Sequence, residues 1–124
     1  MAKILIVEDD EMLMDLMHQT LELSDHIVSG AVNGVDALAK VKADPPELIL
    51  MDIGMPQMDG YEATRRLKAD PATKHIPVIA LTAHASANDR KQAMDAGADE
   101  YEPKPVEFER LEGKIKALLA RGNS

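Results

Sequence analysis

Near the middle of this 124-residue chain lies the segment Glu47-Leu48-Ile49-Leu50-Met51-Asp52. It is an almost unbroken apolar run, which is typical of a central strand that a parallel sheet buries on both faces. We therefore predict a strand over Glu47–Met51, with Asp52 at its carboxyl end. Ligands of open parallel sheets bind outside the carboxyl ends of the strands, so Asp52 is the first candidate for a functional residue.

Outward from this run, short apolar segments alternate with longer segments that have helical spacing. The predicted strands are Lys3–Val7, His26–Ala31, Glu47–Met51, Ile76–Leu81 and Asp99–Glu102. The predicted helices are Glu11–Leu23 with a buried face of Leu13, Leu16, Met17 and Thr20, an Asn33-capped helix to Lys42, Gly60–Lys68, a Ser86-capped helix to Ala96, and an amphipathic helix from Phe108 to Leu119. This alternation indicates an α/β fold, a parallel sheet with helices on both faces.

Length and charge restrict the class of protein. Strand and helix pairs use up all 124 residues, so we expect one domain over residues 1–124, no output domain, and downstream effects through a partner protein. The net charge of −8, with no basic stripe, argues against direct nucleic-acid binding. Cysteine is absent, which excludes disulfides and thiol catalysis. The longest early apolar run, Ile4–Val7, is too short to cross a membrane, so we expect a cytoplasmic protein without membrane insertion.

The carboxyl ends of the predicted strands carry acids, a hydroxyl and a lysine, namely Glu8, Asp9, Asp52, Thr82 and Lys104. Two carboxylates about 5 Å apart repel by roughly 3 kcal/mol at an effective dielectric constant near 20, so clustered acids need a cation or bound protons. Magnesium prefers few carboxylates together with waters and phosphate oxygens, and an oxygen-only cluster suits it better than zinc. The sequence therefore predicts Mg²⁺ as the cofactor.

Phosphoryl transfer is a reaction that such a cluster can support. A carboxylate can attack phosphorus and form an acyl phosphate where positive charge stabilises the transferring oxygens. Lys104 and a metal ion supply that charge, and Thr82 can donate a hydrogen bond that exists only after transfer. Taken one at a time, Asp52 also fits a turn and Thr82 a strand end. The functional interpretation depends on all of them together.

Four segments together resemble the receiver domain of bacterial two-component systems. They are Ile4-Leu5-Ile6-Val7-Glu8-Asp9-Asp10, Asp52-Ile53-Gly54-Met55-Pro56-Gln57-Met58-Asp59-Gly60, Ile76-Pro77-Val78-Ile79-Ala80-Leu81-Thr82-Ala83 and Lys104-Pro105. The resemblance covers essentially the whole chain. It implies a flavodoxin-like (CheY-like) fold, a doubly wound sheet of five parallel strands in the order 2-1-3-4-5 with five helices. It also implies a single-domain response regulator.

The resemblance further implies roles for individual residues. Asp52 would be the phosphoacceptor, assisted by Thr82 and Lys104, and Thr82 and Tyr101 would change position after phosphorylation. For Tyr101 alone, a partly buried strand residue is a competing interpretation. The peptide bond before Pro105 would be cis.

A metal site and partners are implied as well. Mg²⁺ would bind Asp9 and Asp52 directly, Glu8 through water and Gly54 through its carbonyl. A histidine kinase or a histidine phosphotransfer protein would donate the phosphoryl group. A downstream protein would bind the face of the fourth helix, fifth strand and fifth helix. The protein would then be a switch that assists its own phosphoryl transfer and autodephosphorylation, and not an enzyme with a separate substrate.

At some positions the resemblance to the family does not determine what the residue does. Glu102 stands where receivers usually have an apolar strand residue, so the shape and charge of the partner face do not follow from the family. Gly54 and His84 occupy positions that adjust the rate of phosphoryl loss in the family. Met55 and Pro56 are expected to shape the loop beyond Asp52, and His26 is expected at the surface.

Two other classes of protein fit these residues less well than the receiver. A haloacid-dehalogenase-like phosphatase with an Asp52 nucleophile would need a second acid two residues later, where this chain has Gly54. A flavin carrier of similar topology would need a hydroxyl-rich loop after the first strand, where this chain is acidic. A receiver-like module that binds a partner without phosphate remains the open alternative.

Overall fold

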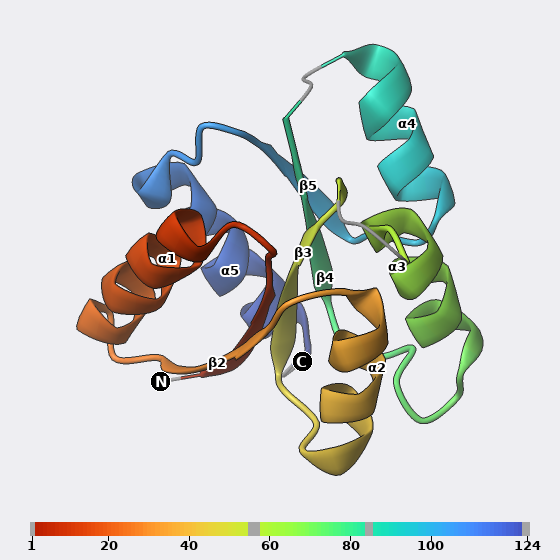
Figure 1. Ribbon diagram of the computed structural model, residues 1–124, viewed down its shortest axis with the longest axis horizontal. Coiled ribbons are helices and arrows are strands. Elements are labelled where there is room, and N and C mark those ends of the chain that lie inside the picture. The colour runs from red at the N-terminus through yellow and green to blue at the C-terminus, as the bar shows by residue number, and fades with distance from the viewer. Residues whose placement is uncertain (1, 55–57, 84–85, 123–124) are drawn as a thin grey trace.

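The computed structural model describes residues 2–54, 58–83 and 86–122. Its parallel strands form one sheet of five in the order β2-β1-β3-β4-β5 (Figure 1). The strands are β1 (Lys3–Val7), β2 (Ile27–Ala31), β3 (Leu48–Asp52), β4 (Val78–Thr82) and β5 (Glu100–Pro103). The helices are α1 (Glu11–Leu23), α2 (Gly34–Ala43), α3 (Gly60–Ala69), α4 (Ala87–Asp95) and α5 (Phe108–Gly122). The predicted fold class, strand order and number of helices are confirmed.

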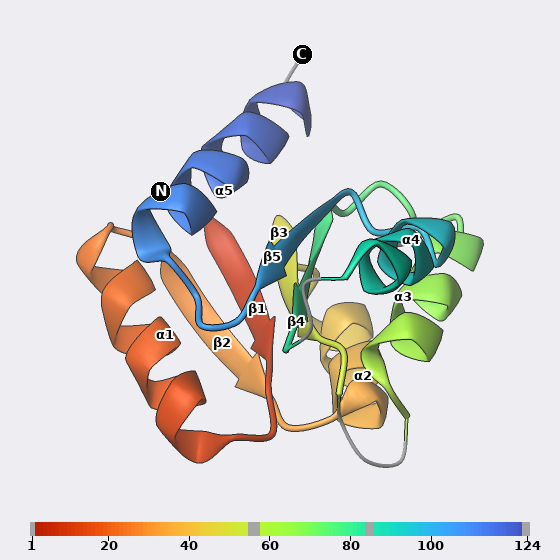
Figure 2. The same ribbon diagram turned by 90° about the horizontal axis from the view of Figure 1, so that it is seen from above.

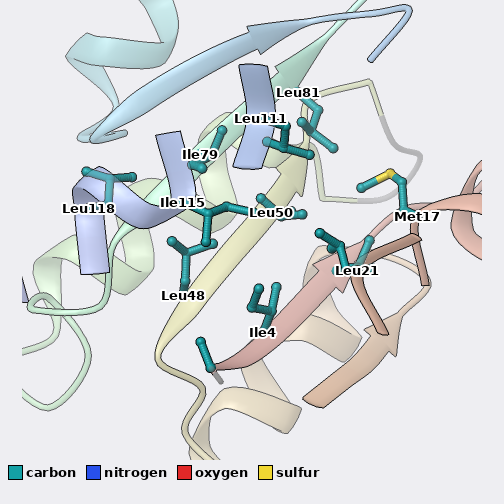
Figure 3. Close-up of a cluster of buried hydrophobic side chains, with 12 residues drawn as sticks. Ile4, Met17, Leu21, Leu48, Leu50, Ile79, Leu81, Leu111, Ile115 and Leu118 are labelled. Carbon is teal, nitrogen blue, oxygen red and sulfur yellow. The ribbon is translucent and has the colours of Figure 1, made fainter. Parts of the chain in front are cut away.

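The helices cover the sheet from both sides, with α1 and α5 on one face and α2, α3 and α4 on the other (Figure 2). Successive side chains of a strand point to opposite faces. In β3, Leu48 and Leu50 pack with α1 and α5, whereas Ile49 and Met51 pack with α2 and α3. Figure 3 shows the first of these clusters, in which α1 and α5 close over the strands. The central strand is therefore buried on both faces, as its apolar run predicts.

Most element ends lie within one residue of their predicted places. An exception is β4, which begins at Val78 and not at Ile76. Pro77 has no backbone N–H to contribute to a strand ladder, and the Val78 N–H donates to Asp99 Oδ2 at 2.9 Å. Helix α5 continues past Leu119 to Gly122.

Polar side chains cap the first four helices. The predicted caps Asn33 and Ser86 accept hydrogen bonds from the first turns of α2 and α4. Asp10 and Asp59 cap α1 and α3 in the same way, and neither was predicted as a cap. Each cap satisfies a backbone N–H that has no partner inside the helix. Because Asp10 serves the start of α1, Glu8 and Asp9 are the acids that remain for a site after β1.

The sheet register brings the functional strand ends to one edge. Asp52 lies opposite Leu81, and Thr82 lies opposite Pro103. Asp52 and Thr82 are therefore the last residues of neighbouring parallel strands, and Lys104 directly follows β5.

Candidate phosphoryl and metal site

A hollow of about 370 Å³ opens at the carboxyl edge of the sheet. The predicted site residues Glu8, Asp9, Asp52, Gly54, Thr82 and Lys104 all line it. Asp52 and Thr82 are each 4% exposed, whereas Asp9 is exposed at the rim. The structure thus brings together every predicted site residue except Tyr101, which is half-buried on β5 and is not among the lining residues.

Lys104 forms the polar centre of the hollow. Its Nζ donates to Asp52 Oδ1 at 3.0 Å and lies 3.1 Å from Glu8 Oε1. Its backbone N–H donates to Thr82 O at 2.7 Å, which ties the start of the turn after β5 to the end of β4. Burial lowers the pKa of Lys104, but the hydrogen bond to Asp52 and the charges of Asp52 and Glu8 raise it further, and the net pKa lies above its ordinary value. Lys104 is therefore a fixed cation beside Asp52.

Three carboxylates gather around this cation. Glu8, Asp9 and Asp52 each offer an oxygen, and these oxygens lie within 4.8 Å of one another. Burial, and then the charge of Asp52, raise the pKa of Glu8 to about 7. Glu8 Oε1 is buried without a partner of hydrogen-bond geometry, although Lys104 Nζ is 3.1 Å away. An under-satisfied, crowded set of carboxylate oxygens fits a hard divalent cation such as Mg²⁺.

The main chain around Asp52 is closely packed. The Gly60 N–H donates to Ile53 O at 3.1 Å, so the chain returns to the end of β3 where α3 begins. A Cβ at Gly60 would lie 2.2 Å from Asp52 O, a distance that no side chain tolerates. The Gly54 N–H lies 3.4 Å from Asp52 Oδ1, and the predicted ligand role of the Gly54 carbonyl stays a prediction.

The hollow also contains residues that the sequence did not indicate for this site, namely Tyr61 of α3 and Asp89 and Gln92 of α4. The Tyr61 hydroxyl donates to Asp89 O at 3.5 Å, and its side chain packs against a small apolar cluster that includes Ala93 of α4. Burial, followed by the charges of Asp89 and Asp59, raises the pKa of Tyr61. Nothing in the motifs marks these positions, because their proximity arises only when α3 and α4 pack side by side.

Other predictions at individual positions have mixed outcomes. The peptide bond between Lys104 and Pro105 is cis, as implied. His26 was expected at the surface, but its side chain is 7% exposed and its Nε2 lies 2.7 Å from Glu112 Oε1. The roles predicted for Met55, Pro56 and His84 lie outside the described residues.

Comparison with known proteins identifies the family. Residues 4–116 match the family of the response regulator receiver domain, and this chain belongs to that family. It is 38% identical over 121 residues to the DNA-binding dual master transcriptional regulator RpaA of Synechocystis, covering 98% of this chain and 50% of RpaA. The chain thus spans about half the length of that relative.

Solved structures have the same fold. A putative response regulator from Chloroflexus aurantiacus superimposes with a TM-score of 0.93 at 30% identity, covering 96% of this chain and 98% of that one. The receiver domain of a sensor histidine kinase from Pseudomonas aeruginosa has a TM-score of 0.89 at 30% identity, with the same coverage of 96% and 98%. That structure has a magnesium ion coordinated in its active site cleft. No helix in the described part of this chain has the length and apolar character needed to cross a membrane.

Proposed function

We propose that Asp52 accepts a phosphoryl group from a phosphohistidine of a histidine kinase or of a histidine phosphotransfer protein. A carboxylate oxygen of Asp52 forms the new P–O bond while the P–N bond of the phosphohistidine breaks. The imidazole nitrogen leaves with the bonding electron pair and takes up a proton. The observation that carries this proposal is the burial of Asp52 in the hollow with Lys104 Nζ 3.0 Å from Oδ1.

The neighbouring residues supply positive charge, metal ligands and a hydrogen-bond donor for the transfer. Lys104 is held as a cation by Asp52 and Glu8, and its charge favours the developing charge on the phosphoryl oxygens. Glu8, Asp9, Asp52 and the Gly54 carbonyl would hold Mg²⁺, which supplies further positive charge to those oxygens when it is bound. Thr82 at the end of β4 supplies a hydroxyl that can donate to the transferred group.

The output follows from contacts that the phosphoryl group creates. Charge-assisted hydrogen bonds contribute about 1.5–3 kcal/mol each, and a shift from 1:99 to 99:1 needs about 5.5 kcal/mol. Contacts from Thr82 and Lys104 supply much of that difference. We propose that the change reaches Tyr101 and the face of α4, β5 and α5, where a downstream protein binds, and that the same site later hydrolyses its own phosphoryl group.

The first test is chemical. The protein is incubated with Mg²⁺ and a small acyl phosphate, and the intact mass of wild type is compared with that of Asp52→Asn. We expect one added phosphoryl group on wild type, and none on Asp52→Asn or without Mg²⁺. Equal labelling of both proteins would place the phosphoryl group elsewhere and would contradict the proposal.

The second test separates a switch from a phosphate-independent binding module. Once a downstream partner has been identified, the affinity of that partner is measured for wild type with and without beryllium fluoride, and for Asp52→Asn. A switch binds the partner tightly only with beryllium fluoride on wild type. Equal affinity in all three states would support the module.

A further inference from the structure

Glu102 is a buried ion that the phosphoryl site does not use. It lies on β5 with 0% exposure, and it is not among the residues that line the hollow. Arg110 of α5 donates to it through Nε at 3.1 Å to both carboxylate oxygens and through Nη2 at 2.6 Å to Oε2. Lys114 Nζ donates to Glu102 Oε1 at 2.9 Å. A single carboxylate thus joins β5 to two turns of α5.

The same carboxylate also closes the turn that carries Lys104. The Glu107 N–H, at the end of this turn, donates to Glu102 Oε2 at 3.4 Å. At the start of the turn, the Lys104 N–H donates to Thr82 O at 2.7 Å. Lys114 also donates to the Tyr101 carbonyl, next to Glu102 in β5. The segment from Glu102 to Glu107 is therefore fixed at both ends, with Lys104 between them.

Stability alone does not account for a buried ion here. Replacing a buried ion pair by apolar side chains of similar volume is often neutral or stabilising. An apolar residue on β5 would therefore stabilise the fold as well as Glu102 does. An arginine and a carboxylate, in contrast, meet in a planar geometry that fixes direction as well as distance. Burial raises the pKa of Glu102, but the hydrogen bonds from Arg110 and Lys114 lower it further, and the net pKa lies below its ordinary value. The carboxylate stays ionised and keeps these bonds.

We propose that Glu102 is a positioning residue that sets where Lys104 Nζ lies over Asp52, through the closed turn between β5 and α5. This inference rests on the proposed phosphoryl transfer to Asp52. It assigns Glu102 a part in the rate of transfer although the side chain does not contact the reacting atoms.

The expected effect is on the rate of phosphorylation. Small displacements of a catalytic group, of the order of 1 Å, cost up to about 100-fold in rate, so a loosened turn is expected to slow transfer about 5- to 20-fold. Glu102→Gln keeps the size of the side chain and removes its charge. Arg110→Met removes one partner and leaves the hydrogen bond from Lys114 to Glu102 Oε1 at 2.9 Å, so the buried carboxylate keeps a cation. Glu109→Gln makes the same charge change at an exposed position of α5 and is the matched control.

The experiment is a double-mutant cycle with Lys104→Met. Phosphorylation by phosphoramidate with Mg²⁺ is followed by intact mass for each single variant and for each pair with Lys104→Met, and beryllium fluoride affinity is measured on the same proteins. Melting temperatures are recorded in parallel. If Glu102 acts through Lys104, Glu102→Gln and Arg110→Met are phosphorylated about 5- to 20-fold more slowly than wild type, and Glu109→Gln at the wild-type rate. When Lys104→Met is already present, Glu102→Gln and Arg110→Met lower the rate no further.

The outcomes separate this inference from the proposed function. If wild type takes up no phosphoryl group, the proposed phosphoryl transfer to Asp52 is wrong, and the positioning role that rests on it is wrong with it. If wild type is phosphorylated at the same rate as Glu102→Gln and Arg110→Met, the positioning role is excluded. If both variants lower the rate by the same factor with and without Lys104, they act independently of Lys104, and the inference is wrong.

Discussion

A single glycine determines the path of the main chain behind Asp52. At Gly60, the first residue of α3, an added Cβ would lie 2.2 Å from Asp52 O and 2.8 Å from Ile53 Cα. Those contacts are backbone atoms, which cannot rotate away as a side chain does. The main chain at the end of β3 and the start of α3 are thus so close that only glycine fits at position 60 without a shift of the backbone.

Gly60→Ala is therefore expected to destabilise the protein by about 1–3 kcal/mol, the usual cost of overpacking. Helix propensity alone predicts the opposite sign, because alanine is favoured over glycine by about 1 kcal/mol inside helices. Gly113 of α5 provides the control, since its Cβ would meet nothing within 4 Å. Gly113→Ala is expected to stabilise by about 0.5–1 kcal/mol. Urea denaturation measures both, and a stabilising Gly60→Ala would show that the chain around Asp52 relaxes freely.

Helix α4 has the fewest buried residues of the helices in the described part of the chain. Ala93 is its one buried residue between Ala87 and Asp95, and the small apolar cluster around Ala93 includes Tyr61 of α3. Helices α1 and α5, in contrast, share the large cluster of Figure 3. Low burial of apolar side chains predicts local opening at low free energy. Tyr61 is therefore expected to contribute to the packing of α4 beside the hollow.

Tyr61→Ala is expected to lower the free energy of unfolding by about 2 kcal/mol, below the 3–5 kcal/mol typical of fully buried aromatic side chains, because Tyr61 is only partly buried. Amide hydrogen exchange should accelerate mainly in α4. Tyr61→Phe keeps the ring and loses only the 3.5 Å hydrogen bond to Asp89 O, so it should stay within about 0.5 kcal/mol of wild type. Faster exchange spread evenly over α1 and α5 would contradict this role for Tyr61.

The elements could be predicted because apolar periodicity is a local property of the chain. The weakest prediction concerned the buried face of α1, where Leu16 is 51% exposed and Leu21 is 1% exposed. Helical spacing indicates that a face exists, but its exact direction depends on how α1 lies on the sheet.

The partners of Glu102 could not be predicted from the sequence, for a related reason. They lie 8 and 12 residues away on another element, and only the packing of α5 against β5 makes its burial possible.

The site itself was predictable to a large extent because parallel topology places strand ends at one edge. Asp9, Asp52 and Lys104 lie together as the order of the strands requires. Tyr61 and Gln92 reach the same hollow from helices, so no rule about strand ends points to them. Tyr101 lies on β5 beside Ala80, and its part in switching stays a prediction.

The net charge of the chain and the acids of the candidate site both favour the binding of a cation. The net charge of −8 sets a negative field, and the acids at the carboxyl edge add to it locally. Such a field attracts divalent cations and disfavours phosphate backbones. The absence of direct nucleic-acid binding and the single-domain organisation both stay predictions.

A cation that binds this edge must stabilise the folded chain as a whole, because the unfolded chain does not hold Glu8, Asp9 and Asp52 together. The stabilisation is about 2.7 kcal/mol at a ligand concentration of 100 times Kd. For a domain of 124 residues, that corresponds to a rise in melting temperature of roughly 10 °C. The measurement is a thermal melt with and without Mg²⁺ at pH 8, above the raised pKa of Glu8, which is about 7.

Asp9→Asn removes a predicted direct ligand at the exposed rim and should lose most of the shift in melting temperature, whereas Asp15→Asn on α1 should retain it. An equal shift in all three proteins would mean that Mg²⁺ acts by general screening of the negative charge and not at this site.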